Sequence, residues 1–236
     1  MGTVLTETRV GPDRASGLLI GMPAFYLFAT WMAAGFTLGI LVASVFEWLL
    51  HRFVMHRRVP VFAYPFERHA LVHHRIFKAD DTYHLKREED RHTVPMAWWN
   101  GPALIAVGQI PFIGLALFIG GLPVVCGSLA AAILYYGAYE YLHWCMHIPR
   151  QRQVERSGIF FRLNGHHLLH HRYMNRNFNV VLPLADLMFG TLQTRSEVCF
   201  AQARGPGVPD VQPKSLRKPA CAAAGSRATP VASRRG

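Results

Sequence analysis

The stretch LPVVCGSLAAAILYYGAYEYLHWCMH (residues 122–147) combines two features that determine how this chain folds. From Leu122 to about Cys145 it is apolar and exceeds the roughly 20 residues that a transmembrane helix needs. It ends in His143 and His147, which are four residues apart and therefore share one face of a helix. Neutral imidazole is the commonest metal ligand among side chains. The stretch predicts a membrane helix that ends in a metal-binding pair.

A second apolar segment, residues 96–119, precedes this helix. Gly120, Gly121 and Pro123 predict a tight turn between the two segments. The turn carries no charge, whereas the flanks of the pair are strongly basic. Positive charge favours the cytoplasmic side, so we expect the hairpin to open toward the cytoplasm.

The first apolar segment, residues 18–50, is longer than one span requires, and Glu47 is its only charged residue. We expect one long helix that begins near Pro23 and leaves the bilayer near Glu47, with the N-terminus on the outer face. The alternative is a two-pass hairpin that turns near Gly35. The prediction is therefore a helical bundle with three or four transmembrane helices.

Histidines form three further clusters beside the apolar segments. These are HRFVMH (His51 and His56), HALVHH (His69, His73 and His74) and HHLLHH (His167, His170 and His171, preceded by His166). Burying imidazole in or beside a membrane is costly, so this clustering indicates a function that offsets the cost. The ligands are too many for one metal ion and suit two. All four clusters fall on the predicted cytoplasmic side.

Spacing within the clusters indicates how the ions are shared. In the last cluster, separations of three and four residues bring the three histidines toward one face. The second cluster is similar, but His74 is turned about 100° from His73, so adjacent histidines can face different metals. His51 and His56 are five apart and cannot chelate one ion from an undistorted helix. Either the helix ends there or the two serve different metals.

Two acidic residues stand in otherwise apolar helix ends. Glu47 lies one turn before His51, and Glu140 lies three residues before His143. Metal-bound histidines usually donate their second ring N–H to a carboxylate or carbonyl, so we expect both acids to bond ligand rings. A salt bridge to an arginine near Arg150 is the alternative for Glu140.

The formal charge of +11 is concentrated in two places. Residues 200–236 are basic and rich in Pro, Gly, Ala and Ser, which predicts a disordered tail. Much of the rest lies beside the apolar segments, where it suits anionic lipid headgroups, and no nucleic-acid partner is expected. The four cysteines have no CxxC spacing, which argues against disulfides and cysteine zinc sites.

The histidine pattern resembles a known family. EWLLHRFVMH, HALVHH, YEYLHWCMH and HHLLHHRYMNRNFNVVLPLADLMFGT, in this order between Phe46 and Thr191, resemble the fatty acid hydroxylase/sterol desaturase superfamily of integral membrane di-iron enzymes. The resemblance implies an all-α membrane bundle with a cytosolic helical cap that holds two Fe ions and activates O2. The ligands it implies are His51, His56, His69, His73, His74, His143, His147, His167, His170 and His171. His166 is then a hydrogen-bonding neighbour, and no catalytic residue beyond the ligands is implied.

The implied function is hydroxylation of an unactivated C–H bond of a membrane lipid, most simply a fatty acyl chain. A desaturase or a sterol or carotenoid oxidase of the same superfamily would share the histidines, and a membrane metal transporter is the rival from another class. The chain has no cytochrome b5-like domain, so a separate donor of the ferredoxin, cytochrome b5 or reductase type is expected. Zinc can replace iron on overexpression, since imidazole sites bind zinc more tightly.

Three segments are predicted: an N-terminal segment (1–16), the membrane di-iron domain (17–199) and the disordered basic tail (200–236). The excess of arginine over lysine suggests a GC-rich bacterial genome, and so a bacterial inner membrane.

Overall fold

In a computed structural model, the chain is described over residues 14–118 and 121–194, with side chains from Ala24 onward. Every regular element in these ranges is a helix, which confirms the predicted all-α class for this part of the chain. The predicted N-terminal segment, apart from residues 14–16, and the predicted tail at 200–236 lie outside the described residues.

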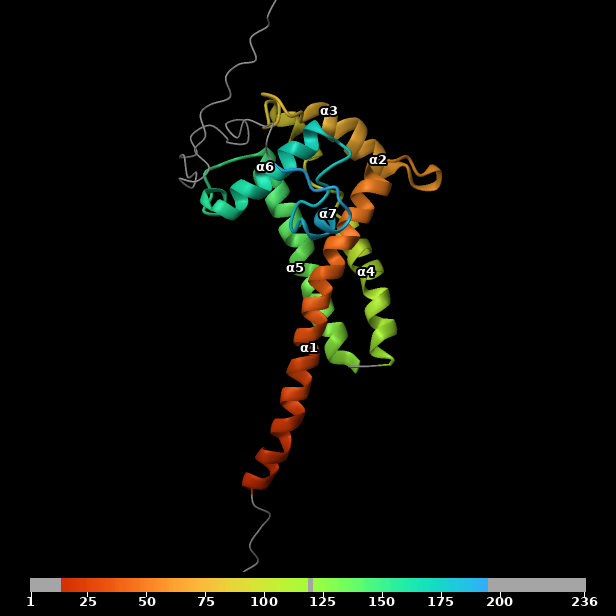
Figure 1. Cartoon of the computed structure of the whole chain (residues 1–236), viewed down its shortest axis with the longest axis vertical. Coiled ribbons are helices and arrows are strands. Elements are labelled where there is room, and N and C mark those ends of the chain that lie inside the picture. Colours follow the sequence, from red (N-terminus) through yellow and green to blue (C-terminus); the bar gives the residue numbers. More distant parts are fainter. Residues whose placement is uncertain (1–13, 119–120, 195–236) are drawn as a thin grey trace, which may run out of the picture. The chain divides into compact units, whose positions relative to one another are not determined.

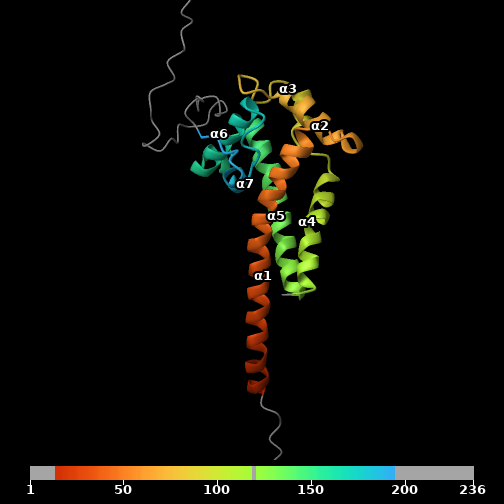
Figure 2. The same cartoon turned by 45° about the vertical axis from the view of Figure 1, so that its right-hand side comes forward.

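Four long helices and several short helical pieces make up the described chain (Figures 1 and 2). The long helices are α1 (Arg14–Leu50), α4 (Asn100–Ala116), α5 (Gly121–His147) and α6 (Gly158–Arg172). The short α-helices are α2 (Tyr64–Arg68), α3 (His74–Ile76) and α7 (Leu184–Met188). Two π-helical turns, η1 (His51–Met55) and η3 (His69–His73), and three 3₁₀ turns, η2 (Pro60–Phe62), η4 (Glu88–Thr93) and η5 (Val154–Arg156), complete the set.

Helix α1 is continuous, so the two-pass alternative for this segment is wrong. The helix begins at Arg14, earlier than the expected start near Pro23, and runs through Gly35 without a break. A turn inside apolar surroundings would expose backbone N–H and C=O groups without partners, and an uninterrupted helix satisfies them internally.

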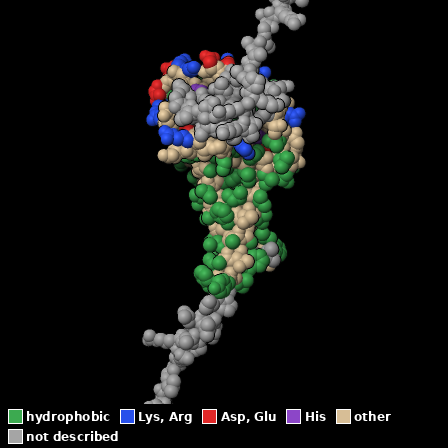
Figure 3. All heavy atoms as spheres, turned by 60° about the vertical axis from the view of Figure 1, so that its left-hand side comes forward, with side chains coloured by type: hydrophobic (Ala, Val, Ile, Leu, Met, Phe, Trp, Pro, Cys, Tyr) green, Lys and Arg blue, Asp and Glu red, His purple; other side chains and the backbone are tan. Residues whose placement is uncertain are grey.

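The second apolar segment forms a shorter helix than the predicted 96–119. Helix α4 has 17 residues. Two helical stretches in the described chain are long and apolar enough to cross a bilayer, Ala24–Met55 and Gly121–His147. Only 22% and 28% of the residues in their most apolar windows are buried, which is typical of helices that face lipid. Figure 3 shows hydrophobic side chains gathered over these helices.

The described chain divides into two compact units, with boundaries inside α1, between η4 and α4, and inside α5. The first contains residues 14–47, 96–118 and 121–139, and the second contains residues 48–95 and 140–194.

In the first unit, small residues let α1 and α5 approach closely. A Cβ atom at Gly127 would lie 2.0 Å from the Met32 carbonyl oxygen, and one at Gly35 would lie 2.3 Å from that of Val124. Such small-residue contacts are the usual basis of helix packing in membranes. Polar side chains add two bonds, since Ser128 Oγ donates to Gln109 Oε1 (2.7 Å) and Tyr135 Oη donates to Glu47 Oε2 (2.7 Å).

In the second unit, α6 is buried over most of its length. Ser157 begins the helix, and its hydroxyl accepts a bond from the Phe160 backbone N–H (3.1 Å). Leu168 and Leu169 pack with Tyr83 in one apolar cluster. Phe77, Val94 and Ile148 form another. Several of these residues are next to histidines in the sequence, such as Leu168 and Leu169 between His167 and His170.

The contact at Gly127 yields a prediction about stability. Gly127→Ala places a methyl group against the α1 backbone, which cannot move away as a flexible side chain would. We expect a loss of about 1–3 kcal/mol, measured by thermal unfolding in detergent. Gly137→Ala on the same helix is the control, because a Cβ atom added there would meet no neighbouring atom within 4 Å. It should be neutral or stabilising by up to about 1 kcal/mol, and equal destabilisation by both would contradict this packing.

Candidate metal centre

The ten predicted ligands gather into two groups of five in the second unit. Within each group the nearest ligand atoms all lie within 4.8 Å of one another. The first histidine group contains His51, His56, His69, His74 and His170, and the second contains His73, His143, His147, His167 and His171. Nine of the ten are buried, and His56 is partly buried.

The first group depends on the two π-helical turns. In η1 the His56 N–H bonds the His51 carbonyl (3.1 Å), and in η3 the His74 N–H bonds the His69 carbonyl. A π turn is wider than an α turn and brings residues five apart into register, and such turns are frequent at functional sites. The α-helix therefore ends at Leu50, and His51 and His56 face the same group. This was the first of the two alternatives left open by their spacing.

The second group rests on ordinary α-helical spacing. His143 and His147 on α5, and His167 and His171 on α6, are pairs four residues apart. His73 completes the group from η3. The prediction that His143 and His147 serve the same ion agrees with this placement.

Neighbouring histidines are divided between the groups. His74 belongs to the first and His73 to the second, as their angular separation predicts. His170 and His171 are divided in the same way, so the expectation that the last cluster converges on one face is wrong for His170. Consecutive side chains on a helix point about 100° apart, so neighbouring histidines can face two adjacent sites. The rings of His74 and His171, from different groups, stack with centroids 4.2 Å apart.

Backbone carbonyls hold many of the rings through Nδ1. His147 donates to the Tyr83 oxygen (2.8 Å), His171 to that of Phe77 (2.6 Å) and His73 to that of Thr93 (3.3 Å). In the first group, His170 donates to the Arg176 oxygen (2.8 Å) and His51 donates to that of Phe178. A neutral ring that donates from Nδ1 carries a lone pair at Nε2. Carbonyls are one of the two kinds of partner expected for metal-bound histidine rings.

The Nε2 atoms of the second group cannot all be satisfied by protons. His147 and His171 present lone pairs to His167, at Nε2–Nε2 distances of 3.1 and 3.0 Å. His167 has at most one Nε2 proton, so one of the two contacts lacks a hydrogen bond. A cation among these nitrogens would accept every lone pair.

The first group has the same deficit. His51, His69, His74 and His170 make three successive Nε2–Nε2 contacts of 2.8, 3.1 and 3.2 Å. The two end rings donate from Nδ1 and supply no Nε2 proton, so two protons must serve three contacts. In both groups, a bound metal ion would therefore satisfy more of the Nε2 atoms than hydrogen bonds between the rings can.

Burial keeps these rings neutral. It lowers the pKa of His56 to about 2, with His170 adding to the effect, and lowers the pKa of His170 to about 4. Five further rings have pKa values well below 6.5. Burial is the largest cause, and neighbouring imidazoles add to it, at His69, His73, His74, His167 and His171. Neutral imidazole is the form that binds metal.

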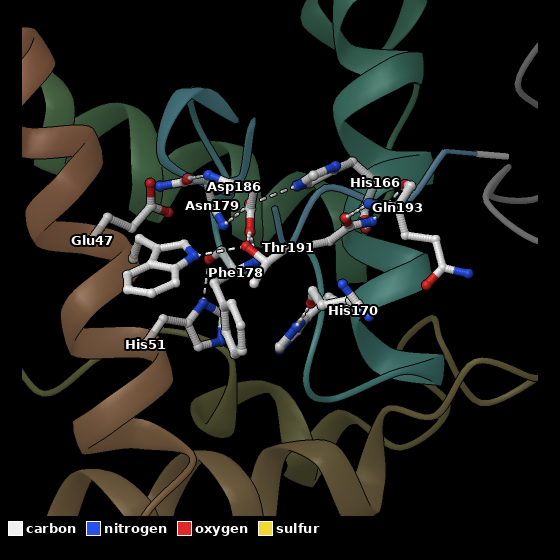
Figure 4. Close-up of polar contacts among 12 residues, drawn as sticks. Glu47, His51, His166, His170, Phe178, Asn179, Asp186, Thr191 and Gln193 are labelled. Carbon is white, nitrogen blue, oxygen red and sulfur yellow. Dashed lines mark hydrogen bonds and ion pairs between the residues drawn. The ribbon is translucent and has the colours of Figure 1, made fainter. Parts of the chain in front are cut away.

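The segment after α6 forms a hydrogen-bonded loop around Asp186 (Figure 4). The Asp186 carboxylate is fully buried and accepts bonds from the Phe178 and Asn179 N–H groups (2.9 and 2.8 Å) and from the Thr191 hydroxyl (2.6 Å). His166 lies outside both groups, with Nε2 3.2 Å from Asp186 Oδ2. Burial alone would raise the pKa of Asp186, but these hydrogen bonds lower it below its ordinary value.

The predicted roles of the two other acids stay predictions. Glu47 accepts a bond from Tyr135, and Glu140 is partly buried on α5. His84, which lies outside both groups, is partly buried, and its Nδ1 donates to the Met146 carbonyl (3.1 Å). Asp186 was not among the predicted site residues, and the sequence offered no signal for the carbonyl partners, because every residue has a carbonyl.

Comparison with known proteins agrees with this arrangement. Residues 36–191, which include all ten histidines, match the family model described as fatty acid hydroxylase. The chain belongs to the fatty acid hydroxylase family.

Three curated relatives show how far this chain resembles known proteins. It is 24% identical over 164 residues to the fatty acid 2-hydroxylase of Rattus norvegicus, covering 66% of this chain and 39% of that protein. It is 27% identical over 159 residues to a dihydroceramide fatty acyl 2-hydroxylase of Arabidopsis thaliana, covering 66% and 60%. It is 28% identical over 161 residues to the fatty acid 2-hydroxylase of Macaca fascicularis, covering 66% and 39%. The match thus covers less than two thirds of each relative, and no solved structure matches the chain.

The two groups predict how many metal ions this chain binds. Metal-stripped protein should bind two equivalents of Zn²⁺, counted by mass spectrometry. The double variant His69→Ala/His74→Ala and the double variant His167→Ala/His171→Ala should each bind one, because each removes central ligands from one group. His92→Ala is the control, since His92 is exposed and lies outside both groups. One equivalent in the unaltered protein would refute the two-site arrangement.

Proposed function

We propose that this chain is a membrane-bound di-iron hydroxylase that inserts oxygen from O2 into a C–H bond of a fatty acyl chain. The observation that carries the proposal is the pair of five-histidine groups, with more lone pairs than protons, in a chain of the fatty acid hydroxylase family. The proposed domain, residues 17–199, encloses the matched residues.

The ten histidines of the two groups are the proposed ligands. Two redox-active irons held there would supply the electron transfer and O2 activation that no side chain can supply. In the overall reaction one oxygen atom enters the C–H bond and the other leaves as water. Two electrons and two protons are consumed.

The chain's own residues would prepare the site in three ways. Burial keeps the imidazoles neutral and excludes bulk water. The backbone carbonyls of residues such as Tyr83, Phe77 and Phe178 fix the ring tautomers. His56, the least buried ligand, marks the side of the first group that is closest to solvent or substrate.

The position of the ligands along the helices favours the carboxyl end of an acyl chain. His51 and His147 lie at the ends of the two candidate membrane spans, rather than in their middle. A bound lipid would bring carbons near its headgroup to this depth, while its methyl end lies deeper in the bilayer. Carbon 2 is therefore the proposed site of hydroxylation, as the names of the relatives state for those proteins.

Two other functions are less well supported. A desaturase would use the same histidines, but the relatives are named as hydroxylases. A metal transporter predicts ligands at mid-span. The proposed electron donor is a separate protein of the ferredoxin, cytochrome b5 or reductase type, and the proposed location is a bacterial inner membrane with the histidines on the cytoplasmic side.

The test is lipid mass spectrometry of cells that express the chain together with a reductase and iron. We expect lipids that gain one oxygen, with fragmentation placing it on carbon 2 of the acyl chain. His143→Ala should abolish the product, and His92→Ala should leave it unchanged. Loss of two hydrogens would identify a desaturase. No lipid change, with zinc or iron uptake into vesicles without O2, would identify a transporter.

A further inference from the structure

Two ligands of the first histidine group take their Nδ1 partners from one short loop. His170 donates to the carbonyl of Arg176, and His51 donates to that of Phe178. These residues lie in the irregular segment between α6 and α7. In the second group, the Nδ1 partners are Thr93, Tyr83 and Phe77, all of which precede α5 in the chain. The loop therefore supports the first group alone through these bonds.

Asp186 holds this loop in place. One carboxylate oxygen, Oδ1, accepts the Phe178 N–H, and the other, Oδ2, accepts the Asn179 N–H. In return, Asn179 Oδ1 accepts the Asp186 N–H (3.1 Å). The loop is thus closed around a buried carboxylate, and the Phe178 residue whose N–H donates to Asp186 also carries the carbonyl that His51 uses (Figure 4).

Other contacts tie the same carboxylate to the helices. Thr191 donates to Asp186 Oδ1 and accepts from Trp48 Nε1 (2.8 Å). Trp48 lies on α1, about one turn before His51 in the chain. His166 on α6 contacts Oδ2. The segments that carry His51 and His170 are therefore both joined to Asp186.

We propose that Asp186 is a positioning residue for the first metal site: it holds the loop carbonyls that orient His51 and His170, and the second site does not depend on it. This inference rests on the proposed function in that the two groups hold metal. It does not depend on which lipid is oxidised or on whether oxidation occurs.

Asp186→Asn is the informative substitution because it preserves the shape of the side chain. The Phe178 and Asn179 N–H groups bond different carboxylate oxygens, and an amide has an oxygen at only one of these two positions. One of the N–H groups faces an NH₂ group instead, and the loop must shift. Partners of metal ligands typically contribute about 10–100-fold to metal affinity. We expect a loss of that size at one site.

The experiment counts Zn²⁺ bound to metal-stripped, full-length protein at a concentration that fills both sites of the unaltered chain. Asp186→Asn should hold one equivalent. Combined with His69→Ala/His74→Ala, which removes the first site, it should still hold one. Combined with His167→Ala/His171→Ala, which removes the second site, it should hold none.

Loss of the second site in place of the first would overturn the proposal. It would show that Asp186 acts on the second group, through His166 and its neighbour His167. Two equivalents in Asp186→Asn would overturn it as well. Lipid oxidation is measured separately, so an inactive chain with the expected metal counts would count only against the proposed function.

Glu155→Gln is the matched control for a general effect of removing a buried acid. Glu155 is also buried in the second unit and accepts backbone N–H groups, from Arg150 (2.9 Å) and Arg152 (3.2 Å), but none of its hydrogen bonds is to a histidine of either group. It should keep two equivalents. Loss of one equivalent here would show that metal binding responds to any weakening of the unit, which contradicts a specific role for Asp186.

Thr191→Val provides a second test if Asp186→Asn does not fold. It removes one bond to the carboxylate and leaves both backbone bonds. The Zn²⁺ affinity of the first site, measured with the second site removed by His167→Ala/His171→Ala, should therefore fall by a few-fold, and that of the second site, measured with His69→Ala/His74→Ala, should stay unchanged. Trp48→Phe, which spares the bond between Thr191 and Asp186, separates this effect from loss of the Trp48 contact. Equal affinities in Thr191→Val and the unaltered chain would overturn the proposal.

Discussion

The convergence of imidazole lone pairs is the constraint on which the rest of the second unit depends. Neutral, buried rings face one another at about 3 Å with fewer protons than contacts, and such an arrangement is repulsive unless a cation lies between them. The fold must therefore hold the rings against repulsion until metal binds. Apolar clusters around Tyr83 and Phe77 and carbonyl bonds to Nδ1 provide that support. Metal binding and the stability of this unit are consequently linked, as in other buried metal sites.

The two groups reach similar compositions by different backbone geometries. The second uses α-helical pairs four residues apart, which any regular helix provides. The first uses two π turns and a loop that is closed around Asp186, so it depends on irregular backbone at three places. Its ligand His56 is also the least buried of the ten. The two sites are thus chemically alike but structurally unequal, and the first is more sensitive to substitutions outside the ligand set.

The first unit meets a different requirement, that of packing helices where lipid is the solvent. Glu47 is the single charged side chain among those described in this unit, from Ala24 onward, and Tyr135 bonds it. Glycines at 35 and 127 let helix backbones touch, so dispersion forces between closely fitted surfaces replace the hydrophobic effect that holds a soluble core. Large apolar side chains such as Phe25, Ile110 and Leu134 remain exposed, as lipid-facing residues do.

Residue pattern alone was sufficient for the helical class, the apolar helices, the family and the candidate ligands, because apolar length and histidine spacing are local properties. It also separated His73 from His74, since adjacent residues on any helix diverge. It failed where the backbone departs from the regular helix. The pairing of His51 with His56, and of His69 with His74, requires π turns, and the transfer of His170 to the first group requires three segments to meet. The carbonyl partners and the network around Asp186 were likewise decided by tertiary structure, because a backbone carbonyl has no sequence signature and becomes a specific partner only when the fold places it beside a ring.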